Sequence, residues 1–237
     1  MAIKPILFNT EMVLAILDGR KTCTRRICKD ANEYTVPDME FYNADRRTYA
    51  VHNFADKEQM EQLSTAERTC PICPGDILYV RETWEHFECC CCEGDEHGNC
   101  YREPQQSALN KSCGCYMYRA TDEIYGDARW HPSIHMPKEA ARIWLKVTDV
   151  RVERLQDITY NGALREGSEG IRCDHVALGV HGCTDCMNTG WIEPPQVEFM
   201  QIWNSTIKES DLDRYGWDAN PWVWVIEFER CEKPKGV

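Results

Sequence analysis

The chain has no hydrophobic run long enough to cross a lipid bilayer. Its longest uninterrupted apolar run, from Met12 to Leu17, is far shorter than the roughly 20 residues that a membrane-spanning helix needs. The first residues also lack the apolar core of a secretory signal peptide. We therefore expect a protein that is neither embedded in a membrane nor secreted, and that resides in the cytoplasm.

Basic residues are too few for a protein that coats nucleic acid by bulk charge. The 237 residues carry 27 Lys and Arg against 39 Asp and Glu, a formal net charge of −12. Binding that neutralises many phosphates normally needs a basic surface. Any contact with nucleic acid must therefore be local. Residues 19–29, which hold several Lys and Arg and no acidic residue, provide one such local segment.

Disorder is excluded by the 43% of hydrophobic residues, and the length suits one large domain or one domain with insertions. Helices are predicted over 10–18, 158–167 and 195–207. Strands are predicted over 21–28, 77–81, 116–119, 143–152 and 222–228. Apolar alternation slips at Thr148-Asp149, which predicts a bulge or tight turn between two strands. The pattern favours a mixed α+β fold, mainly β, arranged as a small barrel.

Three segments are predicted to be insertions into this single domain, namely residues 30–69, 85–116 and 171–193. The last two are rich in cysteine, and the chain holds 15 Cys in total. Dense Cys without a secretion signal is more typical of zinc than of disulfides. We expect about two structural zinc ions, because closed tetrahedral Cys sites replace a core that short loops cannot build.

The predicted ligands of the first zinc ion are Cys89, Cys92, Cys113 and Cys115. Alternates are Cys90, Cys91, Cys100 and His97. The second ion is assigned to Cys173, Cys183 and Cys186, with His175 or His181 as the fourth ligand. A third pair, Cys70 and Cys73, also has C-x-x-C spacing but is not included in these two sites.

Several motifs occur in an order that resembles the ASCH domain of the PUA-like superfamily, in its larger phage or prophage form. The matching pieces are Gly19, Lys21, Thr22, Thr24 and Arg26; Pro74-Gly75-Asp76; Ile158, Thr159, Ala163, Glu166 and Gly167; and the strand from Trp222 to Phe228. The resemblance covers nearly the whole chain. It implies a small PUA-like β-barrel with flanking helices and a cleft for nucleic acid or a nucleoside, in the cytoplasm of a bacterial host if a phage or prophage encodes it. The zinc-stabilised insertions, which the small bacterial relatives lack, would project from this barrel.

The resemblance also implies a reaction. Bacterial relatives remove the acetyl group from N(4)-acetylcytidine with a Lys, a Thr and a Glu, which fall here at Lys21, Thr24 and Glu166. Amide hydrolysis needs a nucleophile, a base and a group that stabilises the oxyanion. Thr24 would attack or position a water, Lys21 would accept the proton, and Glu166 would pass a proton to the leaving amine. We expect Lys21 and Glu166 to line an open cleft.

The expected partner is a modified nucleoside or single-stranded RNA, with Arg20, Arg25 and Arg26 as phosphate-binding residues. Two other functions stay open. In one, Lys21 and Glu166 form a structural ion pair, Thr24 is an ordinary strand residue, and the protein is a non-catalytic RNA- or DNA-binding module. In the other, the protein is a ribonuclease.

Overall fold

The computed structural model describes the chain except for residues 35–36, 43–44, 57, 59–60, 89–113, 124–128, 175–183, 185, 188 and 236–237. The fold is mixed α+β, with more residues in strands than in helices, as predicted. No helix in the described ranges is long and apolar enough to span a membrane.

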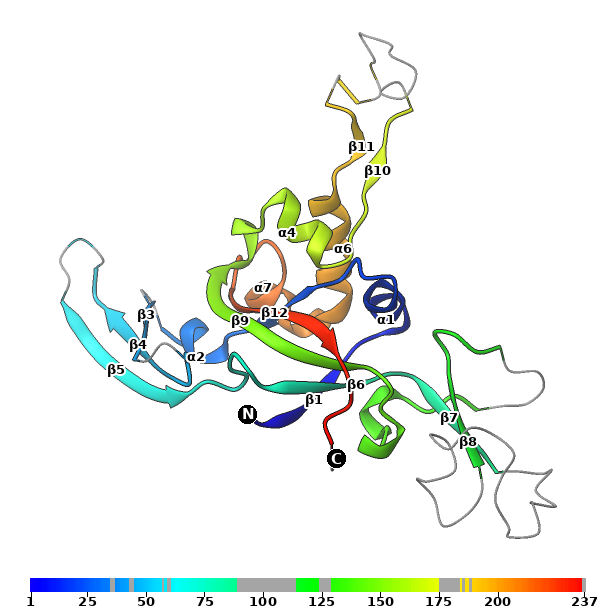
Figure 1. The fold of residues 1–237 in the computed structure, drawn as a ribbon. Coiled ribbons are helices and arrows are strands. Elements are labelled where there is room, and N and C mark those ends of the chain that lie inside the picture. Colours follow the sequence, from blue (N-terminus) through cyan, green and yellow to red (C-terminus); the bar gives the residue numbers. More distant parts are fainter. Residues whose placement is uncertain are drawn as a thin grey trace, which may run out of the picture. The chain divides into compact units, whose positions relative to one another are not determined.

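The largest sheet has five strands in the order β1-β6-β9-β12-β2 (Figure 1). Their bounds are β1 Ile3–Leu7, β6 Ile77–Arg81, β9 Trp144–Arg154, β12 Trp222–Cys231 and β2 Cys23–Ile27. β1 pairs parallel with β6, whereas β6 with β9 and β12 with β2 pair antiparallel. Because β1 and β2 end this order, the described strands form an open sheet and not the closed barrel that the resemblance implied.

The chain divides into two compact units. The first unit comprises Met1–Asp18, Asp76–Lys146 and Arg230–Val237, and the second comprises Gly19–Gly75 and Val147–Glu229. Each unit is built from segments that lie far apart in the sequence. All the residues of the candidate site described below belong to the second unit.

In the first unit, helix α1 (Thr10–Leu17) begins where predicted, because the Asn9 side chain accepts a hydrogen bond from the Met12 amide at 2.9 Å. A hydrophobic cluster includes Tyr116, Met136 and Trp144. Two short 3₁₀ helices, η1 (Ser133–His135) and η2 (Lys138–Ala140), precede β9. Asp76, which has no exposed side-chain surface, receives hydrogen bonds from the Ala2 amide and the Lys4 ammonium.

In the second unit, helices α4 (Tyr160–Arg165) and α6 (Pro195–Thr206) share a hydrophobic cluster with β12. Phe199 and Trp203 come from α6, and Val223 and Val225 come from β12. The other helices among the described residues of this unit are α2 Lys29–Asn32, η3 Leu155–Asp157, η4 Glu209–Asp211 and α7 Leu212–Tyr215. The core of this unit therefore lies between the helices and one face of β12.

Each predicted insertion contributes a small antiparallel sheet of its own (Figure 1). Their strands are β3 Pro37–Phe41, β4 Thr48–Phe54 and β5 Gln62–Thr69; β7 Trp84–Glu88 and β8 Gly114–Tyr118; and β10 Ile171–Arg172 and β11 Trp191–Glu193. Figure 1 shows β10 and β11 as a hairpin that leads away from α4 and α6. The small sheets add no strand to the order of the five-stranded sheet.

Strand β9 corrects one prediction. It runs without interruption from Trp144 to Arg154, where the slip in apolar alternation at Thr148-Asp149 predicted two strands. Side chains alternate faces along a strand, so Leu145 and Val147 share a face with Asp149. Leu145 and Val147 are buried and apolar, whereas Asp149 is paired with Arg46. The period of two continues, but the face changes from apolar to charged.

Candidate functional site

Strand β2, which carries the motif residues Thr24 and Arg26, has two different faces. Cys23 is opposite Glu227 of β12 and Arg25 is opposite Val225, while Thr24 and Arg26 are opposite Ile226 and Trp224. Alternation along a strand places Cys23 and Arg25 on one face, and Thr24 and Arg26 on the other. We call the first the α4 face, because the Cys23 thiol contacts the Gly162 carbonyl oxygen of α4.

Lys21 and Glu166, 145 positions apart, meet on the α4 face. The Lys21 Nζ donates to Glu166 Oε2 at 2.6 Å and to the Glu166 main-chain oxygen at 2.8 Å. The exposed fractions of the two side chains are 0% and 5%. Both are therefore buried, where an open cleft was expected.

Local structure on both sides fixes this contact. Thr159 caps α4 by accepting from the Gly162 amide at 3.0 Å, and Glu166 is the C-cap residue of the same helix. Gly167 follows with a φ of 97°, a left-handed conformation that favours glycine at a helix end. The Thr22 amide also donates to the Arg165 carbonyl oxygen at 2.8 Å, which ties the segment before β2 to the end of α4.

Arg25 makes the second contact to the Glu166 carboxylate. Its NH1 donates to Glu166 Oε1 at 3.2 Å, and its NH2 donates to Glu153 Oε2 of β9 at 3.3 Å. The guanidinium carbon lies 5.8 Å from the centre of the Phe199 ring. Only 2% of the Arg25 side chain is exposed, so Arg25 is a buried partner of two carboxylates and is not presented to an external phosphate. Its Nε is buried and has no hydrogen-bond partner among the described residues.

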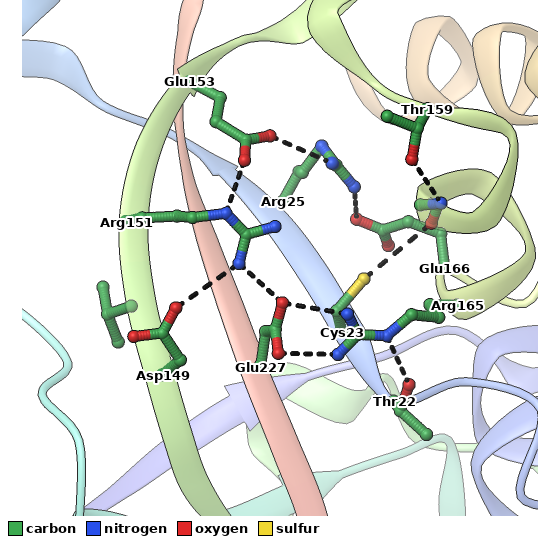
Figure 2. A network of polar contacts seen from close by, with 12 residues as sticks. Thr22, Cys23, Arg25, Asp149, Arg151, Glu153, Thr159, Arg165, Glu166 and Glu227 are labelled. Carbon is green, nitrogen blue, oxygen red and sulfur yellow. Dashed lines mark hydrogen bonds and ion pairs between the residues drawn. The ribbon is translucent and has the colours of Figure 1, made fainter.

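Charged residues of β9 and β12 extend the network toward solvent (Figure 2). Arg151 contacts Glu153, Asp149 and Glu227, and Arg165 reaches Glu227 at 2.7 Å. Hydrogen bonds from Arg165, followed by those from Arg151, lower the pKa of Glu227 despite its partial burial. The contacts thus lead from Lys21 through Glu166, Arg25, Glu153, Arg151 and Glu227 to Arg165, so cations and carboxylates follow one another along the network.

Cys23 lies within this network but is not a reactive thiol. Burial, with the nearby Glu166 charge, raises the pKa of Cys23 to about 12. Its Sγ lies 3.9 Å from the Gly162 carbonyl oxygen. Cys23 therefore stays protonated at neutral pH and packs as a small buried side chain.

Thr24 lies on the face of β2 opposite Cys23 and Arg25, and 1% of it is exposed. The structure thus brings two of the three predicted catalytic residues together, Lys21 and Glu166, and places Thr24 on the other side of the strand. Arg26 shares the face of Thr24 and its NH1 donates to the Arg25 carbonyl oxygen at 3.2 Å. Burial lowers the pKa of Arg26, and the Glu166 charge opposes that shift.

The predicted phosphate-binding residues are separated by the structure. Arg20 is partly exposed, where it contacts the Gly167 carbonyl oxygen and the Glu169 carboxylate, each at 3.1 Å. Arg25 is buried in the network, and Arg26 lines a cavity on the opposite face of β2. The three side chains do not form one basic surface.

Most predicted zinc ligands lie outside the described residues, namely Cys89, Cys92, Cys113, Cys183 and His175. Cys115 lies on β8, opposite Phe87 of β7. Cys173 and Cys186 are both buried. In the part of the chain that the structure describes, no three His, Cys, Asp or Glu residues are grouped to hold a metal. The zinc sites stay a prediction.

Comparisons with protein-family models, with curated proteins and with solved structures each found no match. The ASCH resemblance therefore stays a prediction that rests on the motif residues.

Sequence reasoning missed the acidic and basic partners on β9 and β12, above all Glu153, Arg151 and Glu227. Their signal is present in the sequence, because Asp149, Arg151 and Glu153 alternate along β9 and are all charged. Alternate charged residues on a strand that also carries buried residues indicate an ionic face rather than a break in the strand.

Proposed function

We propose that the protein is of the ASCH type and acts on a modified nucleoside or nucleic acid, by hydrolysing an N-acyl group on a cytosine-type base. The observation that carries the proposal is the 2.6 Å contact between Lys21 and Glu166. These residues come from two separate motifs, and the resemblance assigns both to catalysis. The Arg25 guanidinium, whose NH1 contacts the same carboxylate, has a buried Nε with no hydrogen-bond partner among the described residues, a donor of the kind that a developing oxyanion needs.

The contacts suggest roles that differ from those implied by the resemblance. Each oxygen of Glu166 accepts a hydrogen bond from a cation, so we assign Glu166 as a carboxylate and Lys21 as an ammonium. Glu166 then takes the proton from an attacking water, and Lys21 donates to the acyl oxygen. Thr24, on the other face of β2, is not the nucleophile.

The atoms of this reaction balance with water as the only co-reactant. The water oxygen forms a bond to the acyl carbon, and the bond between that carbon and the exocyclic nitrogen breaks. Glu166 returns its proton to the leaving amine. The products are the cytosine-type base with a free exocyclic amine, still attached to its sugar, and acetate. Because Lys21 and Glu166 are enclosed, the substrate acyl group must displace one of their mutual hydrogen bonds to reach them.

A second function, a non-catalytic RNA- or DNA-binding module, is favoured by the same enclosure. The Lys21 side chain has no exposed surface, and its partner Glu166 also contacts Arg25. This arrangement is typical of a structural ion pair. In this alternative the pair fixes α4 against β2, and ligand binding depends on more exposed basic groups such as Arg20.

The test is to incubate the full chain with N(4)-acetylcytidine and to follow free acetate by proton NMR. We expect release by the wild type. Glu166→Gln should slow turnover by about two to four orders of magnitude, the usual contribution of a general acid or base. Glu169→Gln is the matched control, because Glu169 is a mostly exposed carboxylate that contacts Arg20. Far-UV circular dichroism should confirm that each variant is folded at the assay temperature.

Single-stranded RNA binding, measured by fluorescence anisotropy, separates the two functions. Absence of acetate release by folded wild type, together with RNA binding that Arg20→Gln weakens, would replace the hydrolase with the binding module. If Glu166→Gln and Glu169→Gln release acetate at the same rate, the Lys21–Glu166 pair is not the reactive centre.

A further inference from the structure

A cavity of about 360 Å³ lies on the face of β2 opposite the Lys21–Glu166 pair. Its walls come from β2, α2, β12 and the strands of the 30–69 segment. All of its lining residues belong to the second unit. The predicted insertion of residues 30–69 therefore supplies one wall of a cavity whose other wall carries a residue of the basic motif, Arg26.

The charge of the cavity is opposite to that of the chain. Arg26, Lys29 and Arg68 line it, and Asp30 is its single acidic lining residue in the described part of the chain. Asp30 already has partners, because the Tyr49 hydroxyl donates to it at 2.5 Å and Arg68 Nε lies 3.8 Å from it. Three cations against one carboxylate leave an excess of positive charge in a chain of net charge −12. Because burial also lowers the pKa of Arg26, a bound anion would offset the cost of its desolvated charge.

The rest of the wall is apolar and aromatic. Trp224 and Ile226 come from β12, Val150 comes from β9, and Ile72 follows β5. The Trp224 ring is held edge-on to Tyr49, with ring centres 5.1 Å apart and planes at 81°. Cations and a fixed aromatic ring in the same lining suit a ligand with an anionic group on a flat, less polar body.

We propose that this cavity is a binding site for a nucleoside monophosphate. Lys29, Arg68 and Arg26 would hold the dianionic phosphate, since phosphate accepts several charge-assisted hydrogen bonds at once. The base would lie against the wall formed by Trp224 and Ile226. The volume is at the lower end for small-molecule pockets, which favours a single nucleotide. The net negative charge of the chain disfavours a long nucleic-acid strand.

This site is independent of the proposed hydrolase chemistry. The cavity contains neither Lys21 nor Glu166 among its lining residues, and Arg26 projects to the side of β2 away from Arg25. Loss of acetate release would therefore leave nucleotide binding unaffected, and the two proposals fail separately.

The test is isothermal titration calorimetry of the full chain with cytidine 5′-monophosphate, cytidine and inorganic phosphate. We expect the monophosphate to bind at least about tenfold more tightly than cytidine, because only it engages the three cations. Binding should weaken as salt is raised. The double variant Lys29→Gln/Arg68→Gln should lose about tenfold or more in affinity, and both residues are exposed enough to be replaced without unfolding the chain. Lys208→Gln, an exposed lysine that does not line the cavity, is the control and should bind like the wild type.

Four results would overturn the proposal. The first is no binding of the monophosphate at millimolar concentration. The second is equal affinity in the double variant and the wild type, or an equal loss in Lys208→Gln. In the third, inorganic phosphate binds as tightly as the nucleotide, which would leave no role for the aromatic wall. The fourth is tighter binding of a 5′-phosphorylated oligonucleotide, which would assign the cavity to the end of a strand.

Discussion

Replacing Glu166 by Gln should destabilise the protein far more than the same replacement at Glu169. The Gln side chain keeps the shape of Glu166 but removes the negative charge that faces Lys21 at 2.6 Å and Arg25 at 3.2 Å. With Lys21 fully buried, its ammonium is left without a carboxylate and cannot be hydrated in its place. Breaking a buried ion pair by removing one partner costs about 3–5 kcal/mol of unfolding free energy.

The matched control is an exposed pair of the same chemistry. Glu169 contacts Arg20 at 3.1 Å, but 66% of the Glu169 side chain and 39% of the Arg20 side chain are exposed. Exposed pairs of this kind contribute about 0–1 kcal/mol, because water already solvates both charges. Urea unfolding followed by far-UV circular dichroism, with all variants at one pH and ionic strength, gives both free-energy differences.

A double-mutant cycle with Lys21→Met isolates the pair itself. In the Lys21→Met background, Glu166→Gln no longer leaves a buried ammonium at position 21 without a carboxylate. The loss of unfolding free energy caused by Glu166→Gln should therefore be smaller in that background. Residues in direct contact couple by about 0.5–3 kcal/mol in such cycles. The reasoning is refuted if Glu166→Gln costs the same in both backgrounds, or if it costs no more than Glu169→Gln.

Three further outcomes follow from the sequence and the structure. The hydrogen bond from Arg165 is the chief cause that lowers the pKa of Glu227 in the folded protein. The ionised Glu227 therefore stabilises the fold fully above its unfolded pKa of about 4.5, and this stabilisation is lost as pH falls through the folded pKa. In acid unfolding, Glu227→Gln should lose less stability with falling pH than the wild type. Elemental analysis of protein purified without added metal should give about two zinc ions per chain, and a folded protein free of metal would contradict the predicted Cys sites. Gly170→Ala should destabilise the protein in thermal unfolding by about 1–3 kcal/mol or more, since Gly170 has a φ of 66° and an added Cβ would lie 2.6 Å from the Glu193 carbonyl oxygen; an unchanged midpoint would contradict this.

Local signals were enough to predict several elements of the fold. Apolar periodicity predicted helices over 10–18 and 195–207, and the structure contains them as α1 and α6. The strand predicted over 77–81 is confirmed as β6. These features depend on residues that are neighbours in the sequence, so periodicity suffices to find them.

The sequence did not reveal the 30–69 segment as a sheet. Seven of the eight residues of β5 are exposed, so β5 has no alternation between a buried and a solvent face. Period-two patterning requires that one face of a strand be buried, and β5 lacks one. The cavity wall contributed by this segment was hidden for the same reason, because Tyr49 and Arg68 become part of a site only where the segment packs beside β12 and β2.

The sequence grouped Lys21 with Glu166, but it did not predict that both side chains are buried. Motif order placed Lys21 and Glu166 together, and the structure brings them into contact. The charged residues on β9 and β12 that extend the network beyond Arg25 could not be assigned to it without the register of the sheet. The motif also grouped Thr24 with Lys21, but the structure does not bring these two residues together. Strand alternation places Thr24 on the face of β2 opposite Cys23 and Arg25.

The most direct test of the account is a crystal structure of the protein with an unreactive analogue of N(4)-acetylcytidine, in which a methylene group replaces the amide nitrogen. We expect the acyl oxygen to lie within hydrogen-bond distance of Lys21 Nζ, with the Glu166 carboxylate beside the acyl carbon. An analogue bound elsewhere, with the 2.6 Å contact between Lys21 and Glu166 unchanged, would contradict the central claim that this pair is the reactive centre.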